Sequence, residues 1–219
     1  MKTKVVIFDF DGTLTVSKSS TWGRIWEKID ALDEDEKFMN MYFNNEINYE
    51  TWVSLGYECI KEHNYNETDL DELVSNMKLV DNVENVFKML RDNDIKIYIL
   101  SGGLKIAIEK TLKHLKNYVK QIEATNFLFD EKGNLCGYTV PHHNPENKFE
   151  FVSEVILNEQ VNPKEVLFIG NGKNDETVYK TGVNTLCLNP HKANYENKEI
   201  WHNTIKTNNL EEILPYISC

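Results

Sequence analysis

The stretch VVIFDFDGTLT, residues 5–15, decides the fold. Its β-branched and aromatic residues are typical of a buried strand, and the run ends at Asp9 and Asp11. Because residues two apart in an extended strand project from the same side, about 7 Å apart, we expect both carboxylates at the strand's carboxyl end, where open α/β sheets form ligand sites. Such a pair suits a nucleophile beside a general acid or base. A simple turn would explain Asp11-Gly12, but not a costly carboxylate at Asp9.

Further apolar runs predict a mostly parallel sheet. Each run is short and nearly continuous in apolar residues, as in strands covered on both faces, and helix-like segments separate the later ones. The predicted fold class is α/β, with a Rossmann-like parallel core and a small β-hairpin of Phe127–Phe129 with Leu135–Val140. The strands expected are Val5–Phe8, Ile95–Leu100, Ile122–Phe127, Val166–Ile169 and Val183–Leu188, with a short edge strand at Thr204–Lys206.

A long connection without strand signal separates the first two strands, and a connection of this length forms a domain of its own. We predict an all-helical cap at residues 16–77, lying like a lid over the strand ends of a core made of residues 1–15 and 78–219. The cap helices expected from their amphipathic patterns are Trp22–Ile29, Glu36–Phe43, Tyr49–Ile60 and Asp69–Met77, before a crossover helix at Asp81–Arg91. The aromatic residues expected to form the cap's own core, rather than a substrate wall, are Trp22, Trp26, Tyr49, Trp52 and Tyr57.

Bulk composition excludes several kinds of partner. The 219 residues carry a net charge of −11, whereas nucleic acid or an anionic membrane would need a basic face. No apolar run approaches the roughly 20 residues that span a bilayer. The cysteines show no paired spacing, which favours reduced thiols in the cytoplasm. A small anionic substrate remains compatible if positive charge is concentrated locally, and the composition says nothing of the oligomeric state.

Two other strand ends carry polar, glycine-rich segments. Ser101-Gly102-Gly103 is expected to close the second strand and open a helix, where a hydroxyl and bare amides would cradle phosphate. It is also an ordinary strand-to-helix turn. Gly170–Asp175 closes another strand, and oxygens of Asn171 and Asp175 would suit Mg²⁺. A helix cap would explain the same residues.

Lys148 and the histidine pair carry little signal by themselves. Lys148 stands at the start of a helical run, and a lone lysine is usually a solvated surface charge. His142 and His143 suggest a metal site, but adjacent residues on a strand cannot both face one ion. Flanking prolines mark a loop, so we interpret both histidines as loop residues rather than ligands.

The order of these segments resembles the haloacid dehalogenase (HAD) superfamily, and within it the phosphoserine-phosphatase-like branch. Residues 9–15 match the first motif, Ser101–Gly103 the second, Lys148 the third and Gly170–Asp175 the fourth. The helical insertion is similar to the cap of that branch, including Asn48-Tyr49-Glu50 within it. The resemblance covers essentially the whole chain, and the first motif is its most specific part.

The resemblance implies a phosphatase acting on a small phosphorylated metabolite in two steps. Asp9 would attack phosphorus and become an aspartyl phosphate, while Asp11 would protonate the leaving alcohol and then activate water. Mg²⁺ would be held by Asp9, the Asp11 carbonyl, Asn171 and Asp175. Charge on the phosphoryl oxygens would be stabilised by Ser101, the Gly102 amide and Lys148.

The chain departs from the family pattern at the metal site and at the positions that bind the head group of the substrate. Asn171 stands where aspartate is usual, so we expect weaker Mg²⁺ binding and a raised Mg²⁺ requirement. Phosphoserine phosphatases hold the amino-acid head group with an acidic residue and an arginine, but those positions fall at Lys18 and near Gly56. We therefore predict that phosphoserine is a poor substrate. Lys18 or Arg24 would be available to another head group, although a solvated helix face also explains Arg24.

Other functions stay open at this point. Phosphoserine phosphatase proper and phosphotransfer to an acceptor alcohol would use the same site. A receiver-type signalling domain also combines aspartates, a hydroxyl and a lysine, but it is smaller and lacks the helical insertion. A non-catalytic binding protein on the HAD fold would explain Asn171, but not the presence together of Asp9, Asp11, Ser101, Lys148 and Asp175.

Overall fold

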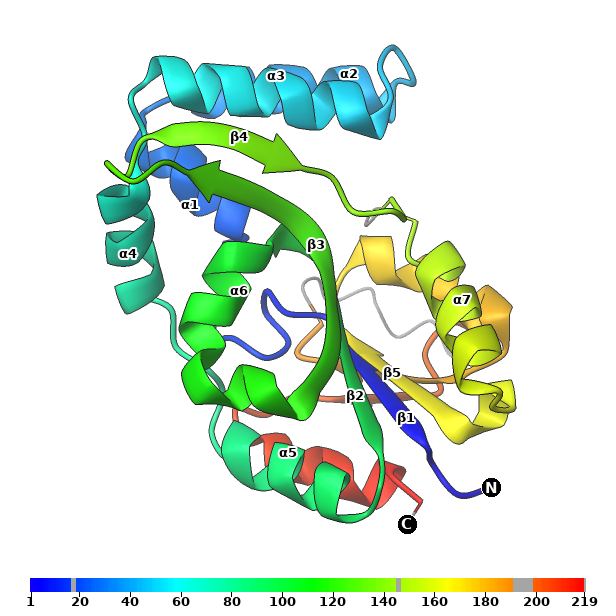
Figure 1. Cartoon of the computed structure of the whole chain (residues 1–219). Helices are drawn as coiled ribbons and strands as arrows, with labels where there is room; N and C mark the ends of the chain where they lie inside the picture. The colour runs from blue at the N-terminus through cyan, green and yellow to red at the C-terminus, as the bar shows by residue number, and fades with distance from the viewer. Residues whose placement is uncertain (17–18, 145–146, 191–198, 219) are drawn as a thin grey trace.

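The computed structural model describes residues 1–16, 19–144, 147–190 and 199–218. A seven-stranded sheet runs in the order β4-β3-β2-β1-β5-β6-β7, and only the β3–β4 pair is antiparallel (Figure 1). This arrangement confirms the predicted parallel core and hairpin. The strands are β1 (Val5–Phe8), β2 (Lys96–Leu104), β3 (Val119–Phe129), β4 (Leu135–Thr139), β5 (Val166–Gly170), β6 (Asn184–Leu188) and β7 (Asn203–Ile205).

The central strand β1 is buried on both faces. Val6 and Phe8 contribute to one apolar cluster, whereas Val5 and Ile7 contribute to the opposite one. This alternation is the two-residue period of a strand covered on both sides. Helices α5 (Val83–Asp92) and α6 (Lys105–Leu112) supply residues to the first cluster, and α7 (Phe149–Glu159) supplies residues to the second.

The segment between β1 and α5 is helical, and we call α1–α4 the helical insertion. It comprises α1 (Thr21–Lys28), α2 (Leu32–Phe43), α3 (Tyr49–Glu62) and α4 (Glu67–Ser75). Side-chain caps define several helix starts: Ser20 accepts from the Gly23 amide, and Asn48 accepts from the Thr51 amide. The domain boundaries at residues 16 and 77 stay a prediction.

The helical insertion does not form a core of its own. Its apolar cluster joins Ile25, Tyr57 and Leu70 to Phe127 of β3 and Leu135 of β4. Figure 1 shows the β3–β4 hairpin lying directly under α3. Short amphipathic helices bury too little apolar surface alone, so they share the core of the hairpin and thereby sit beside the strand ends.

The described residues include no helix that combines the length and apolar character needed to cross a bilayer. The thiols of Cys59, Cys136 and Cys187 are free. Cys219 lies outside the described residues.

Candidate active site

Strand register brings three motif segments to one edge of the sheet. Phe8 pairs with Ile99 of β2 and with Ile169 of β5, so the residues that follow these three positions lie at the same level of the sheet. The Asp9 amide extends this pairing by donating to the Ile169 carbonyl at 2.8 Å. Side chains just beyond these strand ends therefore meet at the carboxyl edge, where parallel sheets form ligand sites.

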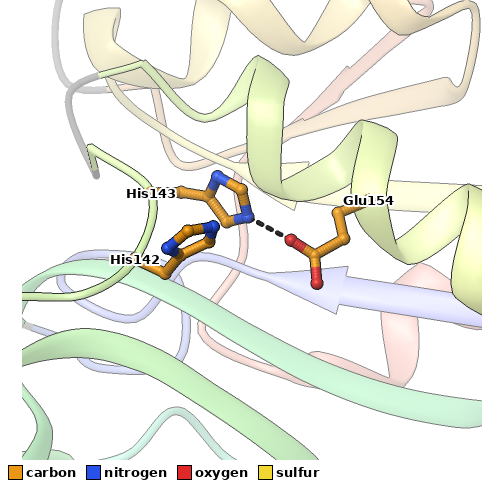
Figure 2. Close-up of side chains that lie close together, drawn as sticks. All are labelled: His142, His143 and Glu154. Atoms are coloured by element: carbon orange, nitrogen blue, oxygen red, sulfur yellow. Dashed lines mark hydrogen bonds and ion pairs between the residues drawn. The ribbon is translucent and has the colours of Figure 1, made fainter.

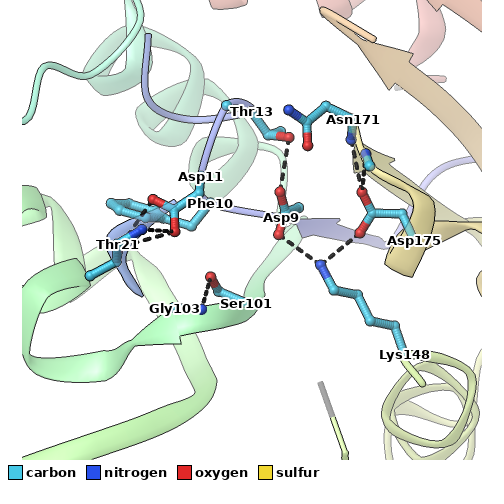
Figure 3. Close-up of polar contacts among 12 residues, drawn as sticks. Asp9, Phe10, Asp11, Thr13, Thr21, Ser101, Gly103, Lys148, Asn171 and Asp175 are labelled. Atoms are coloured by element: carbon cyan, nitrogen blue, oxygen red, sulfur yellow. Dashed lines mark hydrogen bonds and ion pairs between the residues drawn. The ribbon is translucent and has the colours of Figure 1, made fainter. Parts of the chain in front are cut away.

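Lys148 joins Asp9 to Asp175. Its Nζ donates to Asp9 Oδ1 at 2.7 Å and to Asp175 Oδ1 at 2.6 Å, and all three side chains are buried (Figure 3). Burial lowers the pKa of Lys148, but the two carboxylates outweigh it, so the pKa is raised and the lysine stays protonated. Burial raises the pKa of Asp9 to about 7, against the opposing effect of Lys148. Complete burial rules out the solvated role that a lone lysine usually has.

The Gly170–Asp175 loop is closed by Asp175 itself. The second carboxylate oxygen of Asp175 accepts from the amides of Asn171 and Gly172, each at 2.8 Å. A Cβ at Gly170 would lie 2.4 Å from that oxygen, so only glycine allows this closure. Both carboxylate oxygens of Asp175 are thus engaged by protein groups, whereas the side chain of Asn171 lines the cavity next to Asp9.

Asp11 faces the same cavity as Asp9 at the carboxyl end of β1, as predicted. The strand itself is shorter than expected, because β1 ends at Phe8 and Asp11 lies in the following turn, in which Gly12 has a φ of 76°. The Asp11 carboxylate accepts from the Thr21 amide at 2.9 Å and from the Thr21 hydroxyl at 3.0 and 3.1 Å. Burial raises the pKa of Asp11, and the bonds from Thr21 oppose that rise.

The Ser101–Gly103 segment closes β2, as predicted, but it does not itself open the helix, because Leu104 still belongs to β2 and α6 begins at Lys105. The segment is an irregular part of β2, because the flanking Leu100 and Leu104 pair with β3 across a register shift. The almost fully buried Ser101 hydroxyl accepts from the Gly103 amide at 3.0 Å. A Cβ at Gly103 would lie 2.9 Å from Asp11 Oδ2, so glycine lets β2 approach the carboxylates closely.

A cavity of about 300 Å³ connects these groups with the helical insertion. Trp26 and Tyr57 are buried, but in the core shared with the β3–β4 hairpin rather than in the separate cap core expected from the sequence. Trp22, Tyr49 and Trp52 are only partly buried. The expectation that these rings avoid the substrate side is wrong, because the last three and Trp26 line the cavity. The lining residues are Asp9, Asp11, Ser19, Ser20, Trp22, Trp26, Asp35, Met39, Tyr49, Trp52, Val53, Gly56, Ser101, Gly102, Gly103, Asn171, Gly172 and Asn174.

The structure describes two of the three residues considered for binding the substrate head group. Gly56 lies on the cavity wall, and a Cβ at this position would contact the rings of Trp22 and Trp26. Lys18 lies outside the described residues. Arg24 is not one of the lining residues.

His142 and His143 lie in the loop between β4 and α7, as predicted. The Nε2 atom of His143 contacts a carboxylate oxygen of Glu154, and the two imidazole rings meet edge to face at 4.6 Å (Figure 2). One ligand-type atom from each of these residues lies within 4.8 Å of the others. Our interpretation of the pair as loop residues rather than metal ligands stays a prediction.

Sequence reasoning missed three side chains of the site. Thr21 bonds to Asp11, and the Thr13 hydroxyl donates to Asp9 Oδ2 at 3.2 Å. Asp35 of α2 is a carboxylate on the cavity wall. Thr13 sits inside the first motif and offered a signal, whereas nothing in the local pattern around Thr21 or Asp35 points to the strand ends.

Comparisons with known proteins identify the family of this chain. The family model of the haloacid dehalogenase-like hydrolases matches residues 3–178. The phosphoserine phosphatase of Methanocaldococcus jannaschii is 23% identical over 217 residues, which cover 99% of this chain and 98% of that protein. The structure of a phospho-aspartyl intermediate analogue of phosphoserine phosphatase aligns with a TM-score of 0.74 and 22% identity over 99% of this chain and 100% of the other.

A third match extends the likeness in fold. A HAD family hydrolase from Salmonella enterica serovar Typhi aligns with a TM-score of 0.78 and 15% identity, over 99% of this chain and 71% of its own. These matches confirm the predicted fold class and the resemblance to the phosphoserine-phosphatase-like branch. The chain is therefore an enzyme that belongs to the haloacid dehalogenase-like hydrolase family.

Proposed function

We propose that this hydrolase is a Mg²⁺-dependent phosphomonoesterase that cleaves a small phosphorylated metabolite through an aspartyl phosphate on Asp9. Asp9 and Asp11 line the same cavity but have different hydrogen-bond partners, and this observation carries the proposal. Asp9 accepts a hydrogen bond from Lys148, whereas Asp11 accepts one from Thr21. Two carboxylates so distinguished suit a nucleophile and a general acid. The relative from Methanocaldococcus jannaschii is itself a phosphatase.

In the first step, an oxygen of Asp9 attacks phosphorus while the bond from phosphorus to the alcohol oxygen breaks. Asp11 donates its proton to that leaving oxygen, and its raised pKa favours the protonated form that this step needs. In the second step, ionised Asp11 takes a proton from water, which attacks phosphorus and displaces Asp9. Inorganic phosphate and the alcohol are the products.

The phosphoryl oxygens need positive charge and hydrogen-bond donors in an otherwise acidic cavity. Lys148 supplies a permanent ammonium beside Asp9. The hydroxyl of Ser101 and the Gly102 amide, at the end of β2, are the donors that we assign to the other oxygens. Such fixed groups stabilise charge as it develops, which is most of what phosphoryl transfer requires.

The donor set fits Mg²⁺, which prefers hard oxygen ligands. Among the described residues, only the Thr13 hydroxyl donates to Asp9 Oδ2, and Asn171, which has a side-chain oxygen, lines the cavity. We assign the ion to these two residues and to the Asp11 carbonyl. Asp175, whose oxygens already bond to Lys148 and to two amides, would act through water or by positioning. The ion would supply positive charge that offsets the burial of Asp9 and neutralises phosphate oxygens.

Hydrolysis of para-nitrophenyl phosphate across a Mg²⁺ titration tests the proposal, with Asp9→Asn beside the parent. We expect the parent to release nitrophenol in a Mg²⁺-dependent reaction. The rate of release should fall by at least about a thousandfold in Asp9→Asn. Release by Asp9→Asn at the parental rate would overturn the role of Asp9. If the parent releases nothing, trapping Asp9 with beryllium fluoride, read by Mg²⁺-dependent thermal stabilisation, separates a restrictive cavity from a site that cannot be phosphorylated.

We also propose that the enzyme works in the cytoplasm on small molecules rather than on nucleic acid or a membrane. The free thiols of Cys59, Cys136 and Cys187 support a reducing compartment. The net charge of −11 disfavours binding to polyanions.

A further inference from the structure

The proposed chemistry does not use the side of the cavity that lies opposite the strand ends. Asp9, Asp11 and Ser101 form the side where phosphate would react, whereas the helical insertion supplies the opposite side. We call that opposite side, made of Trp22, Asp35, Tyr49, Trp52 and Gly56, the roof. A substrate held by its phosphate at the strand ends would present its alcohol portion to the roof.

The aromatic rings of the roof are held in fixed orientations. Trp22 Nε1 donates to the Gly102 carbonyl at 2.9 Å, which ties α1 to the end of β2. Trp52 stacks on Tyr42 with ring centroids 4.6 Å apart and lies edge to face with Tyr49 at 6.2 Å. Fixed indole and phenol faces with partly exposed surface are the groups that attract organic cations.

Asp35 places a carboxylate among these rings. Its side chain is half-buried, and within the part of the chain that the structure describes it has no hydrogen-bond or ion-pair partner. Burial raises its pKa to about 6, so the group is still mostly ionised at neutral pH. A partly desolvated carboxylate without a protein partner is costly, and a bound cation would offset that cost.

Among the described residues, none of those that form the roof carries a positive charge. None of the described residues that line the cavity is a lysine or an arginine. Gly56 stands near the position where phosphoserine phosphatases carry the arginine for the substrate carboxylate. The roof therefore offers a partner for a positively charged head group and none for a carboxylate.

We propose that the roof binds an ammonium or methylated ammonium group, so that the substrates are phosphomonoesters of amino alcohols without a carboxylate. This inference rests on the proposed phosphatase function. Asp35 supplies the ion pair, and the rings of Trp22, Tyr49 and Trp52 supply faces for the alkylated cation. The phosphate end of the same molecule then lies at Asp9.

The test compares phosphocholine with its neutral isostere, the phosphate ester of dimethylbutanol, in which carbon replaces the ammonium nitrogen. The parent should show a kcat/KM at least about tenfold higher for phosphocholine. Asp35→Asn should reduce that ratio to about two or less. Glu36→Gln, the same change of charge at an exposed neighbour on α2, should keep the parental ratio. A parental ratio near one, or an unchanged ratio in Asp35→Asn, would overturn the proposal.

Two further measurements separate this proposal from the phosphatase proposal. Para-nitrophenyl phosphate has no cationic head group, so its hydrolysis reports on the chemistry alone. If the parent fails to hydrolyse it, titration calorimetry of phosphocholine and the isostere with the intact protein still tests the roof. Tighter binding of phosphocholine that depends on Asp35 supports the head-group site, and equal binding of both compounds overturns it.

Discussion

The ammonium nitrogen of Lys148 lies 2.7 Å from Asp9 Oδ1, and the two side chains are 0% and 8% exposed. The same nitrogen bonds to Asp175, which is equally buried. One cation thus bridges two buried carboxylates, which lie next to the proposed reaction centre. Removing one member of such a buried network leaves charges that nothing compensates.

Lys148→Met should therefore lower the free energy of unfolding by about 3–5 kcal/mol, because Asp9 and Asp175 remain buried. It should also abolish phosphatase activity. Urea unfolding at neutral pH without Mg²⁺ measures the first effect. Lys88→Met, at an exposed position of α5, is the control and should change stability little. If Lys148→Met is as stable as the parent, the positive charge of Lys148 does not contribute to the free energy of unfolding.

Asn171→Asp should strengthen Mg²⁺ binding by about tenfold, since a carboxylate replaces a neutral oxygen ligand. Without Mg²⁺ the added charge lies near Asp9 and Asp175, so the apo variant should be less stable than the parent. Thermal unfolding across a Mg²⁺ titration measures both effects, and the half-maximal Mg²⁺ concentration for hydrolysis should fall in parallel. If the variant binds Mg²⁺ no better than the parent, Asn171 is not a ligand.

Thr21→Val should lower kcat about tenfold with little change in KM. The variant removes the hydroxyl bonds to Asp11 but keeps the shape of the side chain, and a hydrogen bond to a charged group is worth about 1.5–3 kcal/mol. Steady-state kinetics measure the split between kcat and KM. Thr21→Ser keeps the hydroxyl and should restore most of the rate. Equal losses in both variants would point to packing rather than to positioning of Asp11.

Much of the fold could be predicted because its signals are local. The apolar run before Asp9 identifies β1, and turn residues 130–134 identify the hairpin that the β3–β4 pairing confirms. Ser101–Gly103 was harder, because glycines follow strands and open helices alike. The segment belongs to β2 because the flanking Leu100 and Leu104 pair with β3, which is a non-local contact.

The parts of the site that escaped prediction depend on distant segments. Thr21 meets Asp11 only because of the path that the chain takes into α1. Trp22 and Trp52 have the same helical periodicity whether they face a core or a cavity, so pattern alone could not separate the two. Asp35 looks like any acidic residue in the first turn of a helix.

Phosphoserine should be a poor substrate, although the curated relative from Methanocaldococcus jannaschii is a phosphoserine phosphatase. Its carboxylate would face the roof, where Gly56 offers no guanidinium and Asp35 repels it. We expect its kcat/KM to be at least about tenfold below that of the best compound in a phosphomonoester panel. Phosphoethanolamine, which lacks only the carboxylate, is the matched comparison. Turnover of phosphoserine equal to the best of the panel would contradict this reading of the roof.

Glu159 at the end of α7 should make stability depend on acidic pH. Its side chain is 2% exposed and bonds to the ammonium groups of Lys96 and Lys120 and to the hydroxyl of Tyr98. Burial raises the pKa of Glu159, but these hydrogen bonds outweigh it and lower the pKa to about 2. Because the folded pKa lies below the unfolded one, this stabilisation is present above about pH 4.5 and is lost as the pH falls toward about 2.

Glu159→Gln should therefore lower the free energy of unfolding by about 2 kcal/mol at neutral pH, and the difference from the parent should shrink below about pH 4.5. Urea unfolding at a series of pH values measures it. Glu131→Gln, in the exposed hairpin turn, changes the charge equally and should show no such dependence. A difference that stays constant down to about pH 2 would mean that packing of the side chain, rather than its ionisation, holds the end of α7 to β2 and β3.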